Sequence, residues 1–222
     1  MSAGATPIVY GESYSVYVRA VRMALDEKGV AYRLVPVDVF APGGPPAEHF
    51  QRHPFGRIPA FEHAGFRLYE AGAITRYIDE AFPGPALQPA DPPARARMTQ
   101  VIGVMDSYFY RPLVWDIYVE RVAKPARGEA ADEARIAAAL PKAATCPAAL
   151  SDLLGEGPWF AGAALSLADL HAAPMFTPIP LTPESEELLR PHPSLDAWWR
   201  RASARPSFVR TQTPPRHARR SD

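Results

Sequence analysis

The stretch His53-Pro-Phe-Gly-Arg-Ile-Pro-Ala-Phe61 places a glycine turn directly before a predicted strand that opens with a proline. A cis Ile58–Pro59 bond would explain a proline at this position, since the cis form of an X-Pro bond lies only roughly 0.5–1 kcal/mol above trans. In that geometry the N–H and C=O groups of Ile58 are turned outward, where an extended peptide can pair with them as an added strand does. The stretch therefore predicts a turn that binds a peptide-like ligand.

The sequence on both sides of this turn predicts a small mixed sheet. Apolar runs and alternating patterns predict strands at residues 8–10, 32–39, 58–63 and 66–69, and helical spacing predicts helices at residues 15–28, 47–52 and 71–82. The order of elements is β-α-β-α-β-β-α. A helical crossover makes the first two strands parallel, whereas the tight turn at Ala64-Gly65 makes the last two antiparallel, and we expect helices on both faces.

A proline-rich segment divides the chain into two predicted domains. Residues 83–93 contain five prolines and a glycine, which are too many breakers for a regular element to cross. We therefore predict a first domain at residues 1–82, a linker at 83–93 and an all-helical domain at 94–208. Residues 209–222 are basic and proline-rich, which is typical of a disordered tail.

Composition and charge narrow the classes of function. The chain has 222 residues, with 24 Lys plus Arg and 24 Asp plus Glu, so no net charge draws it to nucleic acid or to an anionic membrane. Its single cysteine, Cys146, excludes an internal disulfide and is expected to be a packing residue. The chain has no apolar run of about 18 residues and no signal-like N-terminus. We expect a cytoplasmic protein that binds a small ligand, without metal, membrane or nucleic acid.

Three features of the helical half are interpreted as structural. Pro141 and Pro147 are expected to interrupt an Ala- and Leu-rich helical pattern. Ser166-Leu-Ala-Asp169 is a capping-box pattern, so Asp169 is expected to serve the start of a helix rather than catalysis. The pair Trp198-Trp199 is expected to anchor the core.

The segment Tyr69-Glu70-Ala71 ends a predicted strand and begins a predicted helix. Free N–H groups and the positive end of the helix dipole therefore meet a carboxylate side chain. Glu70 can bind an ammonium group while the amide of Ala71 binds a carboxylate. Together with the turn at Ile58, this arrangement predicts a zwitterionic ligand.

Five stretches carry a family resemblance through their order and spacing. They are Tyr10-Gly11, Asp26-Glu-Lys-Gly-Val-Ala-Tyr32, His53-Pro-Phe-Gly-Arg-Ile-Pro59, Tyr69-Glu-Ala-Gly-Ala-Ile-Thr-Arg-Tyr77 and Ser166-Leu-Ala-Asp169. From about Tyr10 to Phe208 the chain resembles the glutathione transferase family, most closely the serine-type phi class and related bacterial members. The resemblance implies a thioredoxin-like first domain, a helical second domain and a homodimer. It also implies glutathione as co-substrate, with its cysteine backbone on the cis-proline turn.

The resemblance further implies that Ser15, at the start of the first helix, is the catalytic residue. A thiol with a pKa near 8.5 is only a few per cent ionised at neutral pH, whereas a hydroxyl donor and a helix N-terminus favour the thiolate. Lowering that pKa by about two units requires roughly 2.7 kcal/mol, which a charge-assisted hydrogen bond and a helix dipole can supply. Ser13, Tyr14 and Tyr17 are alternative donors.

Three positions depart from the phi-class pattern. The histidine–lysine pair that holds the glycine carboxylate of glutathione is replaced by Gly44-Pro45. The glutamine before the cis-proline turn is replaced by Arg57, which could restore a positive partner. The serine after the strand-end glutamate is replaced by Ala71, which keeps only the backbone amide. Because an unmade hydrogen bond costs about 1–3 kcal/mol, these departures predict weakened glutathione binding.

The leading interpretation is an enzyme that forms the glutathione thiolate near Ser15 and conjugates it to a small apolar electrophile. Tyr108, Phe109 and Trp115 of the helical domain are the candidates for the electrophile pocket. One alternative is a carrier or interaction module that keeps the fold with weakened glutathione binding. Another is a glutathione-dependent isomerase or peroxidase, which shares the thiolate step.

Overall fold

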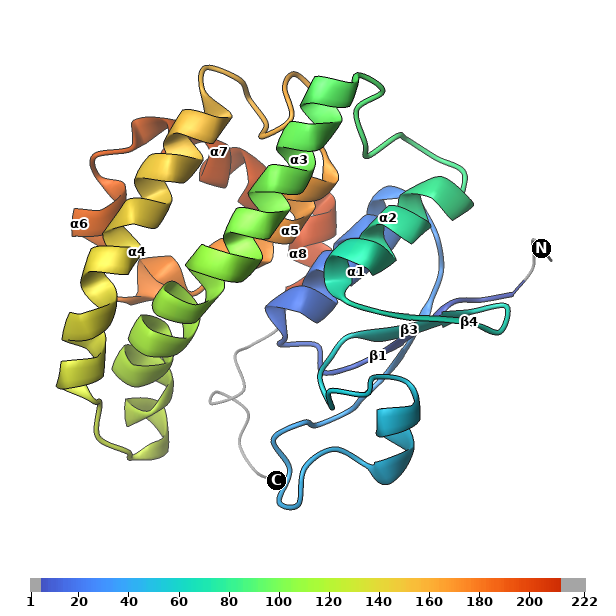
Figure 1. Cartoon of the computed structure of the whole chain (residues 1–222), viewed down its shortest axis with the longest axis horizontal. Helices are drawn as coiled ribbons and strands as arrows, with labels where there is room; N and C mark the ends of the chain where they lie inside the picture. The colour runs from blue at the N-terminus through green and yellow to red at the C-terminus, as the bar shows by residue number, and fades with distance from the viewer. Residues whose placement is uncertain (1–4, 213–222) are drawn as a thin grey trace. The chain divides into compact units, whose positions relative to one another are not determined.

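The computed structural model describes residues 5–212, which form two compact units (Figure 1). The first unit contains the residues up to Leu87 together with a helix near the C-terminal end, and the second runs from Gln88 to Arg205. The division falls within the proline-rich segment 83–93. The N–H of Leu87 donates to Asp79 Oδ1 at 2.9 Å, so the first part of that segment is held on the first unit.

The first unit is built on a four-stranded sheet with the order β2-β1-β3-β4. Its strands are β1 Ile8–Tyr10, β2 Arg33–Val35, β3 Ala60–His63 and β4 Phe66–Tyr69. β1 is parallel to β2 and antiparallel to β3, and β3 is antiparallel to β4, which confirms the predicted strand directions. β2 is shorter than the predicted 32–39. Pro36 has no N–H to continue the ladder of this edge strand.

Helices cover both faces of this sheet (Figure 1). α1 Val16–Glu27 and α2 Ala71–Ala81 pack together on one face, and the short 3₁₀ helix η1 Ala47–Gln51 lies on the other. α1 forms because its apolar residues recur at helical spacing and are buried, and it ends where Gly29 takes a left-handed conformation with a φ of 67°. The element order and the two helical layers confirm the predicted thioredoxin-like fold.

A short helix, α8 Pro206–Thr211, packs on α1 within the first unit. The guanidinium carbon of Arg19 lies 4.5 Å from the centroid of the buried Phe208 ring. Beside it, Ser207 Oγ donates to Glu27 Oε1 at 2.5 Å. The first residues of the predicted tail at 209–222 thus belong to a packed helix, and its residues 213–222 lie outside the described residues.

The second unit is helical, as predicted. Its helices are α3 Pro92–Val104, the π-type helix η2 Met105–Ala123, η3 Pro125–Arg127, α4 Glu133–Leu154, α5 Leu167–Phe176, η4 Ile179–Leu181, α6 Ser185–Leu189 and α7 Pro193–Ser203. α4 runs without a break through Pro141 and Pro147, which corrects the prediction that these prolines interrupt the helix. The buried face of α4, which packs along η2, outweighs the two missing N–H donors.

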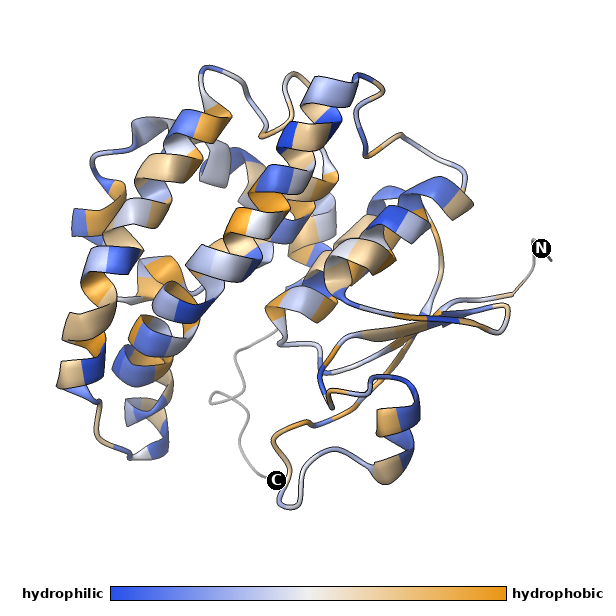
Figure 2. Cartoon of the chain, in the orientation of Figure 1, coloured by the Kyte–Doolittle hydropathy of each residue, from blue (hydrophilic) through white to orange (hydrophobic). Residues whose placement is uncertain are grey.

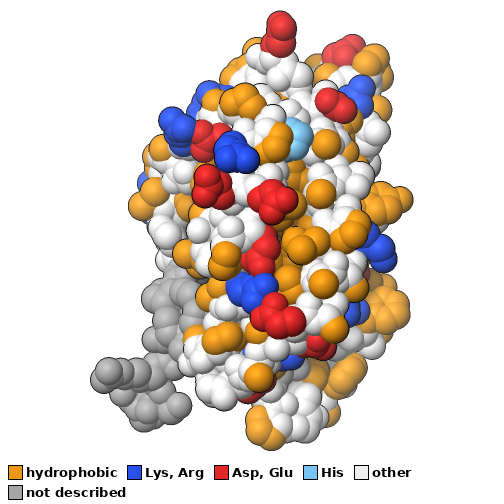
Figure 3. Space-filling model, turned by 90° about the vertical axis from the view of Figure 1, so that its left-hand side faces the viewer, with side chains coloured by type: hydrophobic (Ala, Val, Ile, Leu, Met, Phe, Trp, Pro, Cys, Tyr) orange, Lys and Arg blue, Asp and Glu red, His pale blue; other side chains and the backbone are white. Residues whose placement is uncertain are grey.

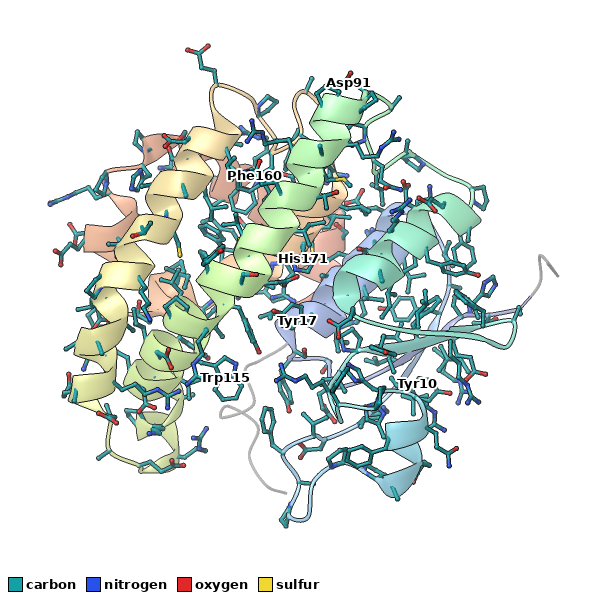
Figure 4. All side chains as sticks on the ribbon, in the orientation of Figure 1. Tyr10, Tyr17, Asp91, Trp115, Phe160 and His171 are labelled. Atoms are coloured by element: carbon teal, nitrogen blue, oxygen red, sulfur yellow. The ribbon has the colours of Figure 1, made fainter. Side chains whose placement is uncertain are left out.

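Asp169 organises the start of α5, as the capping-box pattern predicted. Its Oδ2 accepts hydrogen bonds from the N–H and the hydroxyl of Ser166, at 2.9 and 2.7 Å. Its Oδ1 accepts from the N–H of Phe160 at 3.0 Å and from Trp198 Nε1 at 2.9 Å. Trp198 is fully buried against the rings of Phe160 and Phe176, and Figure 4 shows Phe160 among the helices of this unit. Four donors occupy the carboxylate of Asp169, so its role is structural.

The buried residues of both units are mainly apolar, and hydrophilic and hydrophobic residues alternate along the helices (Figure 2). Figure 3 shows the side of the helical unit that carries α4 and α6, where acidic and basic side chains are interspersed among apolar ones. This face therefore has no strong field of one sign. Among residues 5–212, no helix combines the length and the apolar character needed to cross a bilayer.

Candidate functional site

At one edge of the sheet, β1 and β4 end and β3 begins in the same row. Tyr10 pairs with Ala60, and Ala60 pairs with Tyr69. The residues that leave the sheet from this row are Gly11, Pro59 and Glu70. The register of the strands therefore brings the loop before α1, the Ile58–Pro59 turn and the start of α2 to the same edge. We call Ser15, Ile58, Pro59, Glu70 and Ala71 at this edge the candidate site.

The loop before α1 passes directly against the turn. A Cβ atom at Gly11 would lie 3.1 Å from Ile58 Cβ and 2.6 Å from Val18 Cγ2, which is closer than side chains tolerate. The N–H of Gly11 donates to the carbonyl of Val35 at 2.9 Å, which fixes the loop on the neighbouring strand. Glycine alone permits this approach, so Gly11 brings the loop that leads to Ser15 next to Ile58.

The Ile58–Pro59 peptide bond is cis, as predicted. Pro59 is buried, and Ile58 is half-buried against the apolar cluster around Tyr10 and Ala60. Within residues 5–212, neither the N–H nor the C=O group of Ile58 has a hydrogen-bond partner. These two groups are therefore available to a ligand that has peptide groups of its own.

Ser15 is the N-cap of α1. Its backbone is extended, with φ −65° and ψ 127°, and its Oγ accepts a hydrogen bond from the N–H of Val18 at 3.4 Å. A hydroxyl that accepts one hydrogen bond keeps its own proton for donation. The first turn of α1 contains no acidic residue to offset the positive end of the helix dipole. The start of α1 can therefore stabilise an anion.

The alternative donors lie close to Ser15 in the chain. Ser13 and Tyr14 occupy the turn before α1, and Tyr17 is the second residue of the helix, where Figure 4 labels it. All three side chains are half-buried. The assignment of the donor to Ser15 stays a prediction, with Ser13, Tyr14 and Tyr17 as its alternatives.

A buried cation lies one helical turn after Ser15. Arg19 is 3% exposed, and burial together with the neighbouring Arg22 lowers its pKa to about 10. The guanidinium therefore stays ionised at neutral pH. Residues four apart lie on the same side of a helix, so Arg19 adds a positive charge to the side of α1 on which Ser15 lies, with its guanidinium over the Phe208 ring. From the sequence, Arg19 and Arg22 were interpreted as a solvated or dimer-facing basic stripe or as ligand-binding residues, and the burial of Arg19 corrects the solvated alternative for this residue.

Glu70 adopts a left-handed conformation that is unusual for a residue other than glycine, with φ 69° and ψ 115°. Such conformations cost of order 1–3 kcal/mol and cluster at binding and catalytic sites. Within the described part of the chain, the exposed carboxylate of Glu70 makes no hydrogen bond or ion pair. The first N–H groups of α2, beginning at Ala71, have no partner inside the helix. The carboxylate of Glu70 and the free N–H donors of α2 thus lie side by side.

The loop at Gly44-Pro45 lies beside the turn and carries no side-chain donor. A Cβ atom at Gly56 would lie 3.4 Å from Pro45 Cγ, so Pro45 is next to the residue that precedes Arg57. Arg57 is exposed, and its guanidinium makes no hydrogen bond or ion pair to the part of the chain that the structure describes. The positive charge of Arg57 is therefore available to an anion that lies beside this loop, which has no side-chain donor of its own.

Two buried histidines behind the turn were not predicted. His49 Nε2 lies 2.7 Å from the carbonyl oxygen of Arg57. The ring centroid of His53 lies 6.3 Å from that of His49 and 4.9 Å from that of Tyr69. Burial is the main cause that lowers the pKa of His53, and the neighbouring His49 and Arg57 lower it further. His49 is a single histidine in a short helix and carries no periodic signal, whereas His53 belongs to the turn stretch but was assigned no role of its own.

The three residues predicted for the electrophile pocket belong to the second unit and lie in different environments. Phe109 is 1% exposed and stacks on Phe176 with 4.9 Å between ring centroids, so it is a core residue and offers no surface to a ligand. Tyr108 is 66% exposed. Trp115, labelled in Figure 4, is half-buried on η2 with its ring edge-on to Tyr110. Tyr108 and Trp115 stay predictions, whereas Phe109 is left out of the proposed pocket.

Comparisons with known proteins agree with this arrangement. Residues 5–80 match the model of the glutathione S-transferase N-terminal domain, and residues 104–206 match that of the C-terminal domain. The chain is 32% identical over 215 residues to glutathione S-transferase F14 of Arabidopsis thaliana, an alignment that covers 94% of this chain and 82% of that protein.

Solved structures of the same kind are also similar to the chain. Glutathione S-transferase III in its apo form aligns with a TM-score of 0.81 and 28% identity, over 95% of this chain and 99% of that one. A theta class glutathione S-transferase from Xanthomonas axonopodis pv. citri, solved with glutathione bound, aligns with a TM-score of 0.81 and 27% identity, over 93% of this chain and 97% of that one.

Proposed function

Because this chain belongs to the glutathione S-transferase family, we propose that it activates the thiol of glutathione and conjugates it to a small apolar electrophile. The proposal is carried by the close packing of Gly11 on Ile58, since this packing joins the N-terminus of α1 to a free peptide edge. Glutathione is a tripeptide with one thiol, one ammonium group and two carboxylates. Each of these groups has a chemically matched partner at or beside the candidate site.

Ser15 is the proposed donor to the sulfur of glutathione. A hydrogen bond from its hydroxyl, the dipole of α1 and the buried charge of Arg19 all favour the thiolate over the thiol. Lowering the thiol pKa from about 8.5 to about 6.5 raises the thiolate fraction at pH 7 from a few per cent to roughly three quarters. The thiol proton leaves to solvent. The thiolate then attacks the electrophilic carbon, a C–S bond forms, and the leaving group departs with the electron pair of its own bond.

The backbone of glutathione is proposed to bind along the sheet edge. The N–H and C=O groups of Ile58 pair with the cysteinyl residue, as an added strand would. Glu70 binds the ammonium group of the γ-glutamyl residue, and the amide of Ala71 at the start of α2 binds its carboxylate. Hydrogen bonds to charged groups contribute about 1.5–3 kcal/mol each, so the γ-glutamyl end is expected to dominate the affinity.

Arg57 is the proposed partner of the glycyl carboxylate of glutathione. Gly44-Pro45 supplies no side-chain donor, whereas the guanidinium of Arg57 is exposed and starts from the turn itself. A guanidinium can bind a carboxylate through two parallel hydrogen bonds. Tyr108 and Trp115 are proposed to contact the electrophile.

Calorimetric titration with glutathione tests the proposal. We expect one site per chain and a Kd between about 10 μM and 1 mM, which corresponds to roughly 7 to 4 kcal/mol of binding free energy. If the bound thiol is ionised, binding at pH 7 releases protons, so the observed heat depends on the ionisation enthalpy of the buffer. S-methylglutathione cannot ionise and should show no such dependence. Absence of binding at 10 mM glutathione would refute the proposal.

A glutathione-independent carrier is the second candidate, because Gly44-Pro45 and Ala71 lack the side-chain donors of the phi-class pattern. The two candidates differ in turnover. The enzyme accelerates the reaction of glutathione with 1-chloro-2,4-dinitrobenzene above the uncatalysed rate, whereas a carrier binds apolar dyes without doing so. Reduction of an organic hydroperoxide by glutathione is the parallel assay for a peroxidase.

The same resemblance leads us to propose a homodimer. Light scattering of the purified chain should give twice the mass of one chain. A single-chain mass at micromolar concentration would refute the dimer while leaving the proposed chemistry untouched, because the groups assigned to glutathione all lie in one unit of one chain.

A further inference from the structure

We propose that His49 is a positioning residue, which holds the peptide group between Arg57 and Ile58 so that the N–H of Ile58 faces the ligand. The inference rests on the proposed function, in which that N–H binds glutathione. His49 lies on η1, behind the turn, and is 0% exposed. Its Nε2 lies 2.7 Å from the carbonyl oxygen of Arg57, at the short end of the range for an N–H···O hydrogen bond.

This hydrogen bond controls an N–H group that His49 does not touch. The carbonyl of Arg57 and the N–H of Ile58 belong to one planar trans peptide, so they point in opposite directions. Fixing the carbonyl therefore fixes the direction of the N–H. Accepting a hydrogen bond also polarises the peptide group, which strengthens its N–H as a donor by about 10–30%.

The contact also determines the tautomer of His49. A carbonyl oxygen can only accept, so Nε2 must carry a proton and donate it to this carbonyl. Nδ1 is buried and has no hydrogen-bond partner among residues 5–212. A buried polar atom without a partner costs about 1–3 kcal/mol. This loss of stability occurs at the same residue whose Nε2 holds the carbonyl of Arg57 in the Ile58–Pro59 turn.

His53 extends this support to the second ligand-binding segment. Its ring lies near that of His49 and packs on Tyr69, the residue before Glu70. Burial first, and then the neighbouring His49 and Arg57, lowers the pKa of His53, which favours its neutral form. The two histidines thus form a packed connection between the Ile58 turn and the start of α2.

The proposal is tested with two substitutions of similar length at His49. The amide of Gln can donate to the carbonyl of Arg57, whereas Met cannot. We expect His49→Met to raise the Kd of glutathione about tenfold and His49→Gln to stay within about threefold of the natural chain, since tenfold matches the loss of one hydrogen bond. In both variants, kcat at saturating glutathione and KM for 1-chloro-2,4-dinitrobenzene should change by less than about twofold.

His63→Met is the matched control. His63 is 7% exposed in the same unit, and its Nδ1 forms a 2.9 Å hydrogen bond with the hydroxyl of Tyr77, but it lies at the opposite end of β3 from Ile58. This variant should lower Tm as His49→Met does and leave the Kd of glutathione within about twofold. Equal rises in Kd for the two Met variants, or no rise in His49→Met, would overturn the proposal.

A measurement on the unmodified protein keeps the proposal independent of how the variants fold. Nitrogen-15 spectra of the histidine rings report which nitrogen carries the proton, and we expect Nε2 for His49. An unprotonated Nε2 would overturn the proposal. If the natural chain does not bind glutathione, the proposed function fails. The role of His49 is then still tested by the protonation of its Nε2. It is also tested by the amide resonance of Ile58, which should shift in His49→Met and stay nearly unchanged in His49→Gln.

Discussion

Arg210 on α8 donates two hydrogen bonds to Asp26 on α1, from Nε to Oδ1 at 2.9 Å and from Nη2 to Oδ2 at 2.6 Å. The two residues are 184 positions apart, so the end of the described chain packs on the helix that Ser15 begins. The Arg210 side chain is 61% exposed, however, whereas Phe208 beside it is buried. Exposed ion pairs contribute only about 0–1 kcal/mol. We therefore expect burial of Phe208 to stabilise α8 more than the ion pair does.

Phe208→Ala is predicted to lower the free energy of unfolding by about 3–4 kcal/mol, because it leaves a cavity beneath Arg19. Arg210→Ala should lower it by less than about 1 kcal/mol, since the ion pair is exposed. Urea unfolding, followed by far-ultraviolet circular dichroism, measures both values. Equal losses for the two variants would show that the ion pair stabilises α8 as much as the buried ring does, which would contradict this prediction.

The sheet and the helices of the first unit could be predicted because their signals are local. Gly29 ends α1 and the turn at Ala64-Gly65 joins β3 to β4, and each acts within a few residues. The packing of α8 could not be predicted in this way. Its sequence is short and basic, and its stability comes from Phe208 and other contacts with a segment far away in the chain.

In the candidate site, the sequence predicted the turn and the start of α2. It did not predict the residues that hold them in place. The cis bond at Pro59 followed from a proline at the start of a strand. The roles of His49 and His53 could not be predicted, because they depend on which carbonyl or ring the fold brings to each side chain. Phe109, predicted for the pocket, is buried, because helical spacing alone cannot separate core from surface. The i→i+5 bonding of η2 also changes which side chains share a face.

Gly11→Ala is predicted to weaken glutathione binding at least tenfold and to lower stability by about 1–3 kcal/mol. Its methyl group would lie 2.6 Å from Val18 Cγ2 and 3.1 Å from Ile58 Cβ, so it must push the loop away from the turn. Calorimetry and urea unfolding measure the two effects. Gly103→Ala is the control, because a Cβ there meets nothing within 4 Å and α3 should gain about 0.5–1 kcal/mol.

The thiol of Cys146 is predicted to be unreactive in the folded protein. Burial raises its pKa to about 11, and Sγ donates to the carbonyl of Tyr108 at 3.0 Å. Since a raised thiol pKa favours the protonated form, only roughly one thiol in a thousand is ionised at pH 8, and the thiolate is the reactive species. Ellman's reagent should therefore label the chain at pH 8 only after urea unfolding. Rapid labelling of the native protein would contradict the buried position.

Arg57→Ala is predicted to raise the Kd of glutathione about three- to tenfold, because it removes the proposed partner of the glycyl carboxylate. The glycyl monoethyl ester of glutathione lacks that negative charge. Its Kd should be the same for Arg57→Ala and for the natural chain, which isolates the interaction. Arg67→Ala, which removes an exposed guanidinium that pairs with Glu62, should change neither Kd. A parallel loss of affinity for the ester would contradict the assignment.

Ser15→Ala is predicted to lower turnover of 1-chloro-2,4-dinitrobenzene at pH 6.5 by at least tenfold while changing the Kd of glutathione by less than about threefold. The serine hydroxyl lowers the thiol pKa, so its removal raises that pKa and leaves less thiolate at low pH. The loss should therefore be smaller at pH 8.5, and the pH–rate profile should shift to higher pH. Ser15→Thr keeps the hydroxyl and should retain most of the activity.

Asp91→Ala separates this chemical effect from the loss of a helix cap. Asp91, labelled in Figure 4, caps α3 by accepting a hydrogen bond from the N–H of Ala94 at 2.9 Å, as Ser15 accepts one from Val18. Both Ala variants should lose about 1 kcal/mol of stability, but the turnover of Asp91→Ala should stay normal. If Ser15→Ala also keeps its turnover and its pH–rate profile, Ser15 only caps α1. The hydroxyl that donates a hydrogen bond to the sulfur of glutathione must then belong to Ser13, Tyr14 or Tyr17.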